Sequence, residues 1–148
     1  MDIKILLRLI DKFFKPGEVF AHCDVPCGIY DPKPAQIAAE TVVKMVEKIQ
    51  VFDNKTANVA DRNSLVRAIW TKEEHARRCK EELLILWTDF FKNEHLKMFP
   101  NLHETFWNAA KLCSKNKQEV SMEAALKLKK TVDEIAEMFN RVKSAAAK

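Results

Sequence analysis

Residues 35–51 read AQIAAETVVKMVEKIQV, and apolar side chains recur among them every three or four positions. This period predicts an amphipathic α-helix. Its apolar stripe continues just past the end of the segment and comprises Ala38, Val42, Met45, Ile49 and Phe52. Neither glycine nor proline occurs in residues 35–99 or 101–148. A β-sheet protein of this size needs many more turn residues, so the sequence predicts an all-α fold.

Three more helices are expected from the same pattern. They cover about residues 59–91 and 102–115, and a last stretch that follows a capping Ser121 and continues to about residue 143. The segment from Leu83 to Trp87 is apolar on every side, which predicts burial at the bundle centre or at a subunit contact. Helices joined by short links pack antiparallel, so we expect an up-and-down four-helix bundle over residues 35–143.

The composition excludes several classes of protein. With 148 residues, 47% of them hydrophobic and 31% charged, the chain is expected to form one globular domain. The net charge of +4 is mixed with acidic residues and does not form the basic stripe of a nucleic-acid-binding protein. No segment is long and apolar enough to span a membrane.

The first 21 residues form a separate segment. Residues 1–14 have the spacing of an amphipathic helix, and the sequence before Ala21 is similar to the small-residue box that signal peptidases cut. Charged residues interrupt the apolar run that secretion needs, which favours a cytoplasmic protein. We interpret residues 1–21 as a leader removed by a maturation protease acting after Ala21, leaving a domain of residues 22–148. The alternatives are a helix packed on the domain and, ranked last because its charges offset one another, a helix bound to a membrane surface.

The residues with metal-binding chemistry gather directly after this leader. Residues 22–30, which read HCDVPCGIY, are here called the hook. They place the imidazole of His22 and the thiols of Cys23 and Cys27 within six positions. Spacing alone favours a zinc clip or a disulfide over a redox-active metal site.

Cleavage before His22 would favour the redox-active metal site over the zinc clip or disulfide, because it creates a terminal amine. The amine, the Cys23 amide nitrogen and the Cys23 thiolate can then chelate one metal ion through two fused five-membered rings. The Cys27 thiolate completes a planar set of two nitrogens and two sulfurs, and the His22 imidazole can approach along the axis. Planar coordination with nitrogen donors suits Ni(II) or Cu(II), whereas zinc prefers a tetrahedron of side chains.

Three neighbouring residues shape the hook. Gly28 permits a tight turn, and Asp24 can tie the hook to the body of the protein. Tyr30, the only tyrosine of the chain, can place its phenol over the open axial face, or it can serve as a packed anchor, which is the commoner fate of such aromatics.

The remaining cysteines and histidines are interpreted as structural. Cys79 and Cys113 fall in helical patterns and are predicted to be buried thiols. His75, His95 and His103 lie on helices or connectors and are expected to be surface or capping groups.

Residues 22–32, of the form His-Cys-Asp-x-Pro-Cys-Gly-x-Tyr-Asp-Pro, resemble the metal-binding hook of nickel superoxide dismutases. The similarity continues through LWTDFFK at residues 86–92 and through residues 99–103, Phe-Pro-x-Leu-His. The resemblance implies an enzyme that converts two superoxide ions and two protons into oxygen and hydrogen peroxide. It also implies one nickel ion per subunit and a homohexamer of four-helix bundles.

The resemblance also implies a role for each matching residue. His22 would supply its amine and an axial imidazole nitrogen, Cys23 its amide nitrogen and thiolate, and Cys27 its thiolate. Tyr30 would be the gating phenol beside the vacant axial position, and Asp24 a support outside the ligand set. The chief competing hypothesis is a non-catalytic bundle that uses the same residues as a structural zinc clip or a nickel-storage clip.

The sequence departs from the family pattern at three positions. Some members orient the axial imidazole with a carboxylate on the first helix and an arginine on the second, where this chain has Ala38 and His75. Phe90 stands where some members have a second tyrosine. We expect these changes to alter the support of the axial histidine and to leave the ligands intact.

Overall fold

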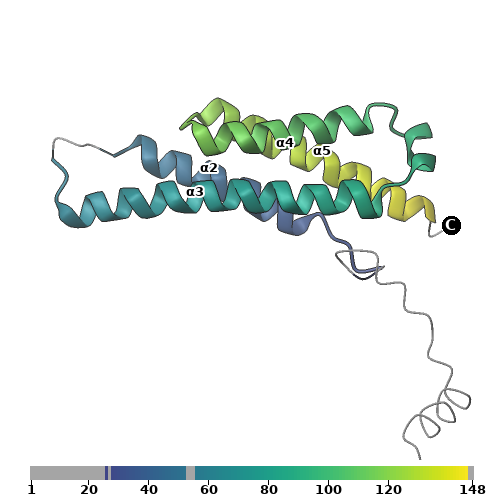
Figure 1. Ribbon diagram of the computed structural model, residues 1–148, viewed down its shortest axis with the longest axis horizontal. Coiled ribbons are helices and arrows are strands. Elements are labelled where there is room, and N and C mark those ends of the chain that lie inside the picture. Colours follow the sequence, from purple (N-terminus) through teal and green to yellow (C-terminus); the bar gives the residue numbers. More distant parts are fainter. Residues whose placement is uncertain (1–25, 27, 53–55, 147–148) are drawn as a thin grey trace, which may run out of the picture.

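The computed structural model describes residues 26, 28–52 and 56–146. They form four long helices, α2 (Lys33–Gln50), α3 (Val59–Ile85), α4 (Leu102–Gln118) and α5 (Met122–Ala146), and contain no strand. Consecutive helices run antiparallel, and each packs against two neighbours: α2 and α4 both contact α3 and α5 (Figure 1). The all-α fold and the up-and-down four-helix bundle are therefore confirmed.

Helix α2 packs between two neighbours, which widens its buried face. Ala38 and Val42 are buried as predicted, whereas Met45, Ile49 and Phe52 are only half-buried. The fully buried face extends instead through Ala35, Ala39, Val43 and Val46. Small side chains on this face let α2 approach both α3 and α5 closely.

Helix α3 begins and ends with recognisable local chemistry. At its start the Asp61 amide donates to Asn58 Oδ1 (3.0 Å) and the Asn58 amide donates to Asp61 Oδ2 (3.1 Å), a reciprocal capping box. Its end changes to the π-helical turn η1 (Leu86–Phe90), closed by the Phe91 amide donating to the Leu86 carbonyl at 3.0 Å. The predicted helix over 59–91 is thus present, with its last turn widened.

The segment between η1 and α4 contains a short 3₁₀ helix, η2 (Asn93–Lys97). The Lys92 amide donates to His95 Nδ1 at 3.1 Å, so His95 is a capping group as expected. At the start of α5, the Ala124 amide donates to Ser121 Oγ at 3.2 Å, which confirms the predicted cap.

The core has its aromatic side chains at one end of the bundle. Leu83 and Leu86 are buried there, as the all-apolar segment predicts, and Trp87 packs partly buried beside them. Cys79 and Cys113 are completely buried in the same cluster. None of the described helices combines the length and the apolar character that a membrane span requires.

Candidate metal centre

The hook is only partly covered by the structure. His22, Cys23, Asp24 and Cys27 lie outside the described residues, whereas Gly28 and Tyr30 lie inside them. Among the described residues, no group of three or more His, Cys, Asp or Glu side chains is placed to share a metal ion.

The described hook residues Pro26, Gly28 and Ile29 belong to a tight turn. The Ile29 amide donates to the Pro26 carbonyl at 3.3 Å, and Gly28, third in this turn, has φ of +98°. A Cβ added at Gly28 would meet nothing within 4 Å, so the requirement for glycine is conformational rather than steric. The turn is exposed, which leaves this part of the hook on the molecular surface.

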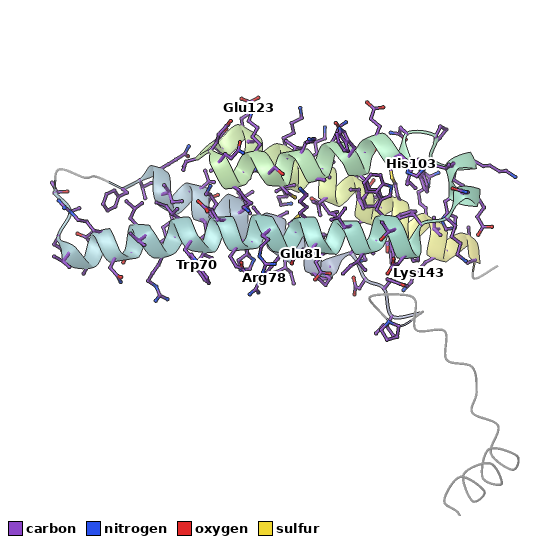
Figure 2. The ribbon with its side chains drawn as sticks, in the orientation of Figure 1. Trp70, Arg78, Glu81, His103, Glu123 and Lys143 are labelled. Carbon is purple, nitrogen blue, oxygen red and sulfur yellow. The ribbon has the colours of Figure 1, made fainter. Side chains whose placement is uncertain are left out.

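Tyr30 marks the point where the chain joins the bundle. Its side chain is 7% exposed and packs on Phe90, with ring centroids 5.8 Å apart and an interplanar angle of 59°. Its main-chain carbonyl accepts a hydrogen bond from Lys143 Nζ of α5 at 3.2 Å. Figure 2 shows Lys143 at the end of the bundle where the chain enters α2. Tyr30 is therefore a packed anchor of the hook, whatever further role its phenol has.

An aromatic layer extends from Tyr30 across this end of the bundle. Phe90 contacts Phe91 (5.0 Å between centroids), and Phe91 contacts Phe106 of α4 (5.4 Å). Trp87 stacks on Phe106 at 5.8 Å with an interplanar angle of 6°. Residues 86–92 thus connect Tyr30, through Phe90, to the aromatic core at this end of the bundle.

Trp87 also joins the two sequence segments that carry the similarity beyond the hook. Its indole Nε1–H donates to His103 Nδ1 at 2.8 Å, near the start of α4. His103 is exposed, as predicted, but it has a specific partner that the sequence did not indicate.

Two of the three departures from the family pattern, Ala38 and His75, have distinct environments. Ala38 is buried on α2 and offers no polar side-chain atom. His75 is half-buried on α3; burial, and next the nearby Arg78 charge, lower the pKa of its imidazole below the ordinary value. A lowered pKa favours the neutral imidazole, so His75 does not reproduce the permanent charge of an arginine.

Comparison with known proteins gives matches along nearly the whole chain. Residues 17–143 match the family described as nickel-containing superoxide dismutase. Superoxide dismutase [Ni] of Streptomyces seoulensis is 34% identical over 138 residues, which are 93% of this chain and 100% of that protein. The Streptomyces coelicolor protein of the same name is 33% identical with the same coverage.

Solved structures agree with the sequence comparison. A crystal structure of Ni-containing superoxide dismutase, with nickel ligation corresponding to the oxidised state, is similar with a TM-score of 0.72 and 33% identity. It is matched over 83% of this chain and 99% of its own. A native nickel superoxide dismutase structure gives a TM-score of 0.71 and 32% identity over 82% of this chain and 99% of that one.

Proposed function

Because the chain belongs to the nickel-containing superoxide dismutases, we propose that it holds its nickel ion in the hook, residues 22–30. The activity follows from the family: the protein is a nickel-dependent oxidoreductase that disproportionates superoxide to oxygen and hydrogen peroxide. The competing hypothesis of a non-catalytic bundle with a storage clip is not favoured by these relatives.

The donor atoms of the hook fit nickel. The proposed ligands are the amine and imidazole of His22, the amide nitrogen and thiolate of Cys23, and the thiolate of Cys27. A free α-amine has a reference pKa of about 7.7–8.0, so its deprotonation at neutral pH costs little. Thiolate and amidate donors stabilise the more oxidised metal, and a planar arrangement with nitrogen donors suits nickel. Gly28, which follows Cys27 in the sequence, has the positive φ that a tight turn of the hook requires.

The terminal amine requires removal of residues 1–21 by a maturation protease acting after Ala21. The lengths of the relatives support this step. The solved chains are matched over 99% of their own length but cover only 82–83% of this chain, whereas the two Streptomyces sequences cover 93% of it. Solved chains without a leader would give this difference.

The residues around the hook would position the reaction. When bound, nickel supplies the one-electron oxidation and reduction that disproportionation requires. Tyr30, held by Phe90 and by the Lys143 bond to its carbonyl, would form a fixed wall and donate its phenolic hydrogen bond to a small oxygen species. The same wall would keep peroxide away from the thiolates, which oxidise readily. Asp24 would tie the hook to the body of the protein.

We also propose a homohexamer in the cytoplasm. Exposed apolar side chains on α3 support assembly: Val59, Val66 and Trp70 follow one another at intervals of seven and four residues and so share a face. Trp70 is 68% exposed and lies on the outer side of α3 (Figure 2). A neighbouring subunit would remove this apolar surface from water.

The observation that carries the proposal is the hook sequence itself, joined to the bundle through the Gly28 turn and the packed Tyr30. Its test is the nickel content and superoxide turnover of mature chains carrying Cys23→Ser or Cys27→Ser. We expect both variants to lose turnover entirely and to bind less nickel. Full turnover in either variant would show that the nickel site lies elsewhere.

A further inference from the structure

Four residues at the C-terminal end of the hook contact one another in a ring, each touching the next. We call this group the exit clamp; it consists of Tyr30, Phe90, Phe139 and Lys143. Tyr30 packs on Phe90 at 5.8 Å, and Phe90 packs on Phe139 at 4.2 Å between ring centroids. Lys143 Nζ lies 4.9 Å from the Phe139 ring centroid and donates to the Tyr30 carbonyl at 3.2 Å. The exit clamp therefore joins the hook, η1 and α5, which are distant in sequence.

Local structure explains why these side chains meet. Phe139 and Lys143 are four residues apart on α5, so they lie on the same face one turn apart. Phe90 is the last residue of η1, and the extra residue of a π-helical turn rotates the next part of the chain relative to a regular α-helix. The turn therefore sets the direction in which Phe90 leaves α3, toward Tyr30 and Phe139.

We propose that Lys143 is a positioning residue for the nickel site. Its ammonium supplies a charged donor to the main chain of Tyr30, three residues after the proposed ligand Cys27. A bond at this point limits how far the hook can swing as it leaves the bundle and keeps the Tyr30 ring against Phe90. This inference rests on the proposed function of the hook.

The competing explanation is that Lys143 only stabilises α5. A cation in the last helical turn interacts favourably with the helix dipole without any effect on the hook. The two explanations differ in what they predict for Tyr30. Positioning requires that loss of the ammonium alters the surroundings of the Tyr30 ring, whereas a purely helical role leaves them unchanged.

The first test uses the fact that Tyr30 is the only tyrosine of the chain. Incorporation of 3-fluorotyrosine into the full chain gives a single ¹⁹F resonance from this ring. In Lys143→Met we expect the resonance to narrow and to move toward its position in urea, and in Lys143→Arg to stay near the wild-type position. The matched control is Lys130→Met on the same helix, since Lys130 is exposed and makes no hydrogen bond or ion pair with any described residue. A resonance unmoved in Lys143→Met would overturn the proposal.

The second test measures the mature, nickel-loaded enzyme. Lys143→Met should lower kcat/KM by roughly threefold to tenfold, the effect of losing one part-buried hydrogen bond of ordinary strength, and Lys143→Arg should restore it. A lower melting temperature with unchanged kcat/KM would assign Lys143 to helix stability alone and contradict positioning.

The proposal that Lys143 positions Tyr30 and the proposal that the hook binds nickel can be disproved independently. The ¹⁹F experiment needs no nickel, so a shifted resonance reports the clamp even in a chain that holds its metal elsewhere. If Cys23→Ser and Cys27→Ser kept their turnover, the hook would be ruled out as the nickel site, and the proposal that Lys143 positions that site would fail with it.

Discussion

The ammonium of Lys72, in the middle of α3, donates to the main-chain carbonyl of Asn116 at the end of α4. It also donates to the carbonyls of Lys117 (3.2 Å) and Glu119 (2.9 Å), so one side chain satisfies three carbonyls where α4 ends. The side chain is 1% exposed, and burial lowers its pKa below the ordinary lysine value. Lysine has three N–H donors, and here each has an acceptor.

Lys72→Met should therefore destabilise the bundle strongly. It keeps the length of the side chain but leaves buried carbonyls without a donor, a loss of roughly 3 kcal/mol in the free energy of unfolding. Urea denaturation measures this loss. The control is Lys80→Met, which removes a single 3.3 Å bond to Ser114 Oγ and should cost less than about 1 kcal/mol. Equal free energies of unfolding for wild type and Lys72→Met would contradict the role of Lys72 as the donor to these carbonyls.

Glu74 should make stability depend on pH in acid. Hydrogen bonds from Arg77 and then Arg78 lower the pKa of its carboxyl from 4.5 to about 2. The folded state therefore binds the proton more weakly than the unfolded state does. The contribution of Glu74 to stability is complete above pH 4.5 and is lost as the pH falls through about 2.

The measurement compares Glu74→Gln with wild type by urea unfolding at a series of pH values. The difference between the two should be constant above pH 4.5 and shrink steadily below it. Glu137→Gln serves as the control, because Glu137 on α5 is exposed and makes no hydrogen bond with any described residue. A difference that does not change across this range would refute the assignment.

Cys79→Ala should retain nickel and most of the turnover. Cys79 is completely buried beside Cys113, and a hydrogen bond with that thiol, together with burial, raises the pKa of Cys79. A protonated, enclosed thiol is a poor metal ligand and a poor nucleophile. The expected cost is limited to about 1 kcal/mol of unfolding free energy for the lost packing, measured by urea denaturation. A variant as inactive as Cys27→Ser would mean that the site extends beyond the hook.

Much of the bundle could be predicted because its signals are local. Three local signals predicted the helices: the lack of glycine and proline in residues 35–99 and 101–148, the recurrence of apolar side chains, and the Ser121 cap. The structure has helices in these stretches and the Ser121 cap at the start of α5. The burial of Cys79 and Cys113 followed from the same helical pattern.

The features that were missed depend on distant contacts. Lys72 has the sequence pattern of a surface lysine, and only the end of α4, more than 40 positions later, gives it partners. Nothing local indicates that η1 widens into a π-turn, or that Lys143 reaches the carbonyl of Tyr30. Tyr30 could be placed in the hook by motif, but its packing on Phe90 required the fold.

The central claim is that nickel binds a hook whose first ligand is the amine of His22. Native mass spectrometry of the protein from nickel-supplied cells with their own maturation machinery tests it most directly, alongside Ala21→Pro as a chain whose cleavage is blocked. The account predicts hexamers of chains that begin at His22, with one nickel ion per chain, and an inactive Ala21→Pro variant that still folds. A full-length chain carrying zinc or no metal, or full activity in uncut Ala21→Pro, would contradict it.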